Sequence, residues 1–116
     1  MPSHVYKICT AAELEEARAK GRFEGSADDR RDGFIHLSAR DQLHGTLARH
    51  FAGRTGLVLL TLDPESLGDG LKWEISRGGA LFPHLYAPLD LAVVLRVEKL
   101  PVGDDGRHSL PPGATA

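Results

Sequence analysis

The feature that most constrains the fold is a nearly continuous apolar run at residues 57–62, Leu-Val-Leu-Leu-Thr-Leu. A short run with no polar side to turn toward water predicts a strand buried on both faces, as at the centre of a sheet. The Asp63-Pro64 pair directly after it favours a turn. The other elements must therefore be arranged around this strand.

Two helices are predicted before the central strand. The first follows a strand at residues 4–9: Thr10 and Glu13 have the spacing of a capping box, and Gly21 ends the helix near Lys20. The second covers residues 40–52. Its buried side carries apolar residues four apart, at Leu43, Leu47 and Phe51, and Ser38 with Asp41 resembles its capping box.

Strands follow in the second half, at residues 71–76, 82–86 and 91–100. Helices early and strands late favour an α+β domain with a mostly antiparallel sheet over a doubly wound fold. The polar stretch at residues 24–32 is predicted to be a loop that lies over the next strand. Residues 1–100 are expected to form one domain, and the Gly- and Pro-rich residues 101–116 a flexible tail.

Composition excludes several classes of protein. The net charge of -2 disfavours broad nucleic-acid binding, which needs clustered Lys and Arg. A single cysteine, Cys9, excludes an intramolecular disulfide and a cysteine-rich zinc site, and its apolar surroundings favour a buried thiol over a nucleophile. The histidines lack a recognised ligand spacing, so no metal is expected. No segment is long and apolar enough to cross a membrane and no signal peptide is visible, which makes the cytoplasm the default location.

A short strand at residues 34–38 is the first candidate for a ligand site. Side chains alternate across a strand, so His36 and Ser38 point one way while Ile35 and Leu37 point to the core. A histidine on the wall of a cleft can act as an acid, a base or a hydrogen-bond donor. Ser38 is expected to cap a helix more than to act as a nucleophile, since no Gly-x-Ser-x-Gly elbow surrounds it.

Two later strands carry further candidates. Glu74 can act as a base or stabilise positive charge on a sugar ring, with a solvated surface role as the alternative. Its neighbour Trp73 either packs in the core or offers a stacking platform. His84 and Tyr86 share a face if residues 82–86 are extended, and Tyr86 can donate its hydroxyl or stack on a planar base.

The chain resembles the small bacterial family known as domain of unknown function 952. The resemblance covers residues 4–100 and rests on three segments: Asp32-Gly33-Phe34-Ile35-His36-Leu37-Ser38, Leu71-Lys72-Trp73-Glu74 and Phe82-Pro83-His84-Leu85-Tyr86. It implies the ADP-ribosyltransferase-like fold, a split, twisted α+β sheet with a nicotinamide-dinucleotide cleft. By the same resemblance His36 would hold a ribose and Tyr86 would stack near nicotinamide.

The leading hypothesis is a nucleotide or ribosyl-ligand cleft with His36 and Glu74 as catalytic residues and NAD as the co-substrate. Its reaction would be ribosyl transfer or cleavage of an N-glycosidic bond. The ligand-binding candidates are Asp32, Ser38, Trp73, His84 and Tyr86. The alternative is a non-catalytic module that binds a small molecule or a peptide. RNA-directed transfer is disfavoured by the acidic charge balance.

Overall fold

The computed structural model describes residues 3–115 and has a mixed α+β fold with antiparallel strand pairing throughout. The strands are β1 (Val5–Thr10), β2 (Arg22–Phe23), β3 (Ile35–His36), β4 (Leu57–Leu62), β5 (Leu71–Ile75), β6 (Leu81–Leu85), β7 (Leu89–Asp90) and β8 (Val94–Lys99). The helices are α1 (Ala11–Lys20), α2 (Ala27–Asp32), α3 (Leu43–His50) and α4 (Pro112–Thr115), with 3₁₀ turns at Arg40–Gln42, Pro64–Gly70, Arg77–Gly79 and Leu91–Val93.

The apolar run at residues 57–62 is the central strand β4, as the sequence predicts. It lies between β1 and β8 in a three-stranded sheet, and all its residues are buried. A second sheet has the order β3-β6-β5, and β2 pairs with β7. The main sheets meet where Tyr6 of β1 exchanges two 2.8 Å backbone hydrogen bonds with Ser38. The strands are therefore split between two linked sheets.

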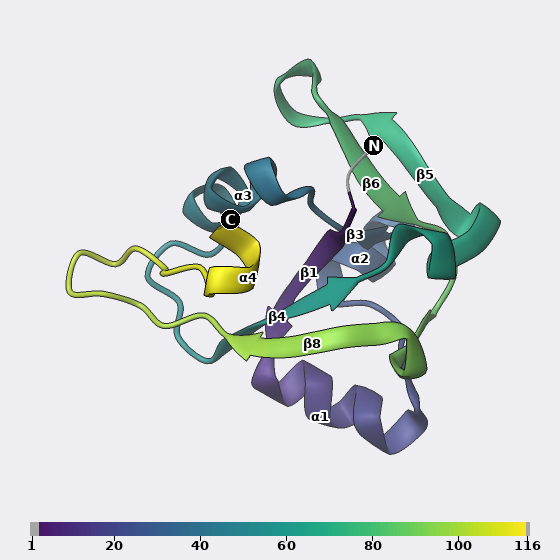
Figure 1. Cartoon of the computed structure of the whole chain (residues 1–116), viewed down its shortest axis with the longest axis horizontal. Helices are drawn as coiled ribbons and strands as arrows, with labels where there is room; N and C mark the ends of the chain where they lie inside the picture. Colours follow the sequence, from purple (N-terminus) through teal and green to yellow (C-terminus); the bar gives the residue numbers. More distant parts are fainter. Residues whose placement is uncertain (1–2, 116) are drawn as a thin grey trace.

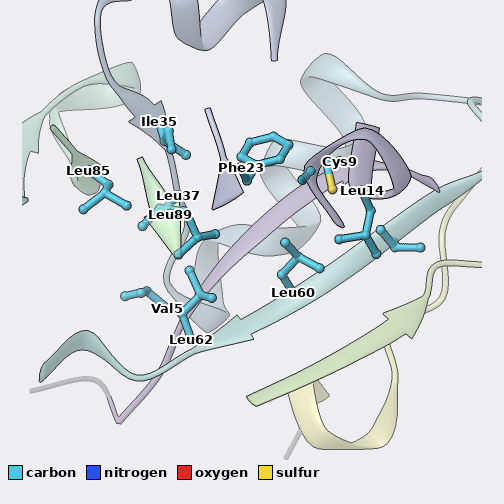
Figure 2. Close-up of a cluster of buried hydrophobic side chains, with 12 residues drawn as sticks. Val5, Cys9, Leu14, Phe23, Ile35, Leu37, Leu60, Leu62, Leu85 and Leu89 are labelled. Atoms are coloured by element: carbon cyan, nitrogen blue, oxygen red, sulfur yellow. The ribbon is translucent and has the colours of Figure 1, made fainter. Parts of the chain in front are cut away.

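Each face of the central sheet has its own core, because β4 has no polar face. On one face, side chains of β1 and β4 pack against α1, β2 and the second sheet; Figure 2 shows Val5, Cys9, Leu14, Leu60 and Leu85 converging there. On the other face Tyr6, Ile8 and Leu59 pack against α3 and α4. Figure 1 shows α1 on one side of this sheet, and α3 and α4 together on the other.

The first helix confirms its predicted ends. The Thr10 hydroxyl accepts the backbone N–H of Glu13 at 3.0 Å, the Glu13 carboxylate accepts that of Thr10 at 2.8 Å, and Gly21 ends α1 in the left-handed region. Cys9 is buried as predicted, and burial raises the pKa of its thiol to about 12. A thiol in that state has almost no thiolate at neutral pH and is no nucleophile.

The predicted loop at residues 24–32 is wrong, because α2 lies there and the first half therefore holds three helices. The backbone N–H of Ser26 donates to Asp29 at 2.9 Å, and Gly33 ends the helix at φ 86°. The sequence contains the signal for this helix: Ser26-x-x-Asp29 followed by Gly33 has the spacing of a cap and a stop.

The predicted cap at Ser38 is also wrong. Pairing with Tyr6 holds the Ser38 backbone extended, so the chain turns one residue later, where the backbone N–H of Ala39 donates to Gln42 at 2.9 Å. Residues 40–42 form a 3₁₀ turn, and α3 begins only at Leu43. Leu43 and Leu47 are buried on α3, as their spacing predicts.

The late strands are present with shifted bounds. The strand predicted at residues 91–100 begins at Val94, after a 3₁₀ turn at Leu91–Val93. Beyond Leu100, Val102 bridges His108, and the buried side chain of His108 bonds the Arg54 carbonyl at 2.8 Å. Ala114 packs in the core beside α3. The flexibility of residues 101–116 stays a prediction, and residue 116 lies outside the described residues.

Candidate functional site

The centre of the candidate site is the buried carboxylate of Asp29 on α2, which is 2% exposed. One oxygen, Oδ2, accepts from Lys7 Nζ at 2.8 Å and from the backbone N–H of Ser26 at 2.9 Å. The other, Oδ1, accepts from the backbone N–H of His36 at 3.0 Å and from His36 Nδ1 at 2.6 Å. Every contact of this carboxylate is with a donor, so it is held as an anion in a fixed orientation.

The partner that balances this charge is Lys7 of β1, itself only 4% exposed. Its ammonium also donates to the backbone carbonyl of His36 at 3.1 Å and lies 5.7 Å from the centroid of the Phe23 ring. A buried ion pair persists only when both charges keep such partners. Lys7 therefore ties β1, α2 and β3 together under the site.

The pKa of Asp29 reflects two opposed effects. Burial acts to raise it, but the hydrogen bond from His36 and the charge of Lys7 outweigh burial and hold the pKa well below its usual range. Asp29 is consequently ionised at all physiological pH values. It can orient His36 and stabilise positive charge on that ring.

His36 has a second carboxylate on its opposite edge. Asp32 Oδ2, at the end of α2, lies 3.0 Å from His36 Nε2, and hydrogen bonds from Arg31 are the main reason that the pKa of Asp32 is lowered. The side chains of His36 and Asp32 are 38% and 34% exposed. The imidazole is thus partly exposed and lies between the buried carboxylate of Asp29 and the partly exposed carboxylate of Asp32.

A second polar cluster lies beside the first, on β5 and β6. Glu74 Oε1 accepts from Tyr86 Oη at 2.7 Å and lies 2.8 Å from His84 Nδ1. These hydrogen bonds, with that of Tyr86 the larger, lower the pKa of Glu74, and the same bond raises the pKa of Tyr86. Glu74 is thereby stabilised as a carboxylate with one oxygen already occupied.

The ring of Phe34 joins the two clusters. Its centroid is 4.6 Å from that of His36, 4.0 Å from that of His84 in a stacked arrangement, and 5.2 Å from that of Tyr86. Strand register causes this convergence: His36 pairs with His84 across β3 and β6, and alternation keeps Phe34, His36, His84 and Tyr86 on one face. Three of the sequence-predicted candidates, His36, His84 and Tyr86, therefore share one surface.

A cavity of about 330 Å³ opens beside His36, between α2 and α3. Its walls include Lys7, Ser26, Asp28, Asp29, Arg31, Asp32, His36, Ser38, Thr46, Arg49, His50, Phe51, Ser76 and Phe82. Positive and negative side chains thus face each other across a small hollow with aromatic patches. Most of these side chains are polar or charged, so the cavity suits a polar or charged small molecule.

The predicted candidates divide into three groups. His36, Asp32 and Ser38 line the cavity, and the Ser38 hydroxyl lies 3.2 Å from that of Thr46. Glu74, His84 and Tyr86 lie beside it, across Phe34. Trp73 is on the opposite face of β5, where it packs against the hydrophobic core, so it has no place near the cavity.

Sequence reasoning missed Asp29, Lys7 and Phe34. Asp29 was hidden in a supposed loop, although its position in the Ser26-x-x-Asp29 pattern marks a cap. Lys7 follows strand alternation into the protein, which only a charged partner from another element can explain.

Among the described residues, no group of three or more His, Cys, Asp or Glu side chains is arranged to hold a metal ion. No described helix is long and apolar enough to cross a membrane.

Comparison with known proteins gives the same fold for a bacterial relative. A family model described as "Protein of unknown function (DUF952)" matches residues 8–97. The X-ray structure of protein CC0527 from Caulobacter crescentus is 50% identical, covers 97% of this chain and 99% of that chain, and has a TM-score of 0.93. Its solution NMR structure is 53% identical, covers 90% of each chain and has a TM-score of 0.82. No curated protein matches this chain.

Proposed function

We propose that this chain, which belongs to the DUF952 family, binds a nucleotide or a related ribosyl ligand in the cavity beside His36. The observation that carries the proposal is the Asp29–His36 pair: a buried, fully bonded carboxylate fixes an imidazole that is 38% exposed and whose Nε2 faces the partly exposed carboxylate of Asp32. Folding rarely needs so many partners for one surface histidine, and fixed orientation is what ligand recognition requires.

The size of the cavity supports one nucleotide-sized group. About 330 Å³ lies at the lower end of the range for small-molecule sites. One half of a dinucleotide such as NAD would fill it, and the other half would lie along the adjoining face, where Tyr86 is 45% exposed. His36 would donate to an oxygen of the ligand, and Phe82 or Phe51 would contact its planar base.

The reaction that suits this ligand class is transfer or cleavage at the N-glycosidic bond. The bond from ribose C1′ to the base nitrogen breaks, the base leaves with the electron pair, and an acceptor oxygen or nitrogen bonds C1′ and releases its proton. Glu74 would stabilise the cationic sugar and His36 would orient the ribose. This activity extends the ADP-ribosyltransferase-like resemblance, which the split antiparallel sheet supports. We propose the cytoplasm as the location of the protein.

A non-catalytic module that binds a small molecule or a peptide is the second candidate, and the position of Glu74 favours it. Glu74 does not line the cavity, and its Oε1 is already held by Tyr86 and His84. Binding at the cavity needs no change in these contacts, whereas catalysis by Glu74 requires the sugar to lie next to its other oxygen. The geometry therefore supports binding more directly than turnover.

Calorimetric titration with oxidised NAD, ADP-ribose and nicotinamide tests the proposal. We expect saturable binding to the wild type and no binding to His36→Gln. The control variant His44→Gln should bind as the wild type does, because His44 lies on α3 outside this cavity. No binding at millimolar ligand to the folded protein would refute it. Release of nicotinamide that Glu74→Gln abolishes identifies an enzyme, and binding without release identifies the module.

A further inference from the structure

Both ring nitrogens of His36 face carboxylate oxygens at hydrogen-bond distance. Asp29 Oδ1 is 2.6 Å from Nδ1, and Asp32 Oδ2 is 3.0 Å from Nε2. An ionised carboxylate can only accept, so a ring nitrogen that bonds either carboxylate does so as the donor. The structure thus places one imidazole between two carboxylates.

The two carboxylates differ in how firmly they are held. Asp29 is buried and has three further donors from Lys7, Ser26 and the His36 backbone. Asp32 is the last residue of α2, its side chain is 34% exposed, and it also pairs with the neighbouring Arg31, itself 68% exposed. Asp29 is a fixed part of the fold, while Asp32 can rotate into solvent at little cost.

We propose that Asp32 occupies the place of an anionic ligand oxygen, and that a phosphoryl group of the ligand displaces it from His36 Nε2. This inference deepens the proposed function by naming the group of the nucleotide that His36 binds. The incoming oxygen takes over a charge-assisted hydrogen bond that the free protein satisfies internally. Asp32 is therefore an autoinhibitory contact that the ligand must open.

The surroundings of Nε2 suit a phosphoryl group once Asp32 has moved. Arg31 and Arg49 also line the cavity, from α2 and α3. Arg31 donates to both Asp28 and Asp32, so displacement of Asp32 leaves part of its guanidinium available. The exchange replaces one anion with another beside His36, so the buried Lys7–Asp29 pair beneath it keeps its charge balance.

The displacement predicts opposite effects from two carboxylates that contact the same ring. Asp32→Asn removes a competing anion and should tighten binding of inorganic phosphate and of AMP by about tenfold. This is the gain expected when the fraction of molecules able to bind the ligand rises from about one tenth to nearly all. Asp29→Asn should weaken both, because His36 loses its fixed partner. Adenosine, which lacks the phosphoryl group, should respond to Asp32→Asn by less than about twofold.

Isothermal titration calorimetry at constant ionic strength makes the measurement, with thermal unfolding as the check on folding. Asp28→Asn is the comparison variant within the same cavity: it removes the same charge from α2 and also frees Arg31, but Asp28 makes no ion pair with His36 among the described residues. We expect it to tighten phosphate binding less than Asp32→Asn does, because it removes a nearby negative charge without removing the group that occupies His36 Nε2. Acetate in place of phosphate distinguishes a carboxylate site from a phosphoryl site.

The inference is overturned if Asp32→Asn fails to tighten phosphate binding, if Asp28→Asn has an equal effect, or if acetate binds as well as phosphate. Its failure is separable from failure of the proposed function. Binding of NAD or ADP-ribose with no effect of Asp32→Asn contradicts only the displacement by phosphate. Tighter phosphate binding without any preference for AMP contradicts only the nucleotide assignment.

Discussion

Replacing Asp29 with asparagine should be among the most destabilising single changes near the site. The carboxylate offers acceptors to four donors, two on each oxygen. Asparagine keeps the shape but replaces one oxygen with an NH₂ group, which must then face donors from Lys7 and Ser26 or from His36. Lys7, 4% exposed, is left as a buried ammonium without its anion.

Removing one partner of a buried ion pair costs about 3–5 kcal/mol. A domain of this size has about 5–15 kcal/mol of total stability, and this loss lowers its Tm by about 10–20 °C. Urea titration followed by circular dichroism measures the change in the free energy of unfolding. The control Asp28→Asn, on the exposed face of the same helix, should cost under about 1 kcal/mol.

The difference in unfolding free energy between wild type and Asp29→Asn should depend on pH, because the pKa of Asp29 is lowered in the folded protein. The stabilisation is complete above the unfolded-state pKa, about 3.9, and is lost as the pH falls from there toward the lower folded-state pKa. Asparagine does not titrate, so the gap in unfolding free energy between wild type and variant should narrow below about pH 4.

A double change separates charge burial from packing. Lys7→Met with Asp29→Leu removes both charges together, and replacement of a buried pair by apolar residues is often neutral or stabilising. The double variant still leaves the backbone N–H groups of Ser26 and His36 without the Asp29 acceptor, so we expect it to be less stable than wild type, but by about 2 kcal/mol less than the sum of the two single changes. A loss below about 1 kcal/mol for Asp29→Asn, or a gap that stays constant into acid, would refute the buried-pair argument.

Three further outcomes test single contacts. Tyr86→Phe removes the strongest hydrogen bond to Glu74, so the pKa of Glu74 should rise toward its usual value in an NMR carboxyl titration; an unchanged pKa contradicts the Tyr86–Glu74 bond. Cys9 should resist alkylation in the native protein at neutral pH and react on unfolding, and rapid native labelling would show that the thiol is accessible. Gly33→Ala should cost about 1–2 kcal/mol, because Gly33 has φ 86° while a Cβ there meets nothing within 4 Å; a neutral effect in urea titration would show that the backbone relaxes.

Local patterns predicted much of the fold. The central strand, the ends of α1 and the buried side of α3 each depend on residues close in sequence, where spacing alone decides what is buried or capped. The structure has α2 where a loop was predicted at residues 24–32. The charged composition of the segment suggested a loop, and the cap at Ser26 and the stop at Gly33 were overlooked. The predicted start of the last strand at residue 91 was wrong because Asp90 caps a 3₁₀ turn there: its carboxylate accepts the backbone N–H of Ala92 at 2.9 Å.

The candidate site was predicted only in part, and for a related reason. Alternation correctly predicted that His36 lies opposite Ile35 and Leu37, and the match to the DUF952 family is confirmed over residues 8–97. The same alternation left Trp73 open between core and ligand, and packing in this structure assigns it to the core. Ser38 shares the cavity with His36, but it is no helix cap, because pairing with Tyr6 fixes its backbone.

The sequence by itself determined the class of fold, the family and, within each strand, which side chains share a face. Tertiary structure decided which of those side chains meet. Asp29 reaches His36 because α2 folds back over β3, and Lys7 reaches Asp29 because β1 runs beneath both. Contacts between separate elements depend on strand register and helix placement, which are set by the whole core and have no short-range signature in the chain.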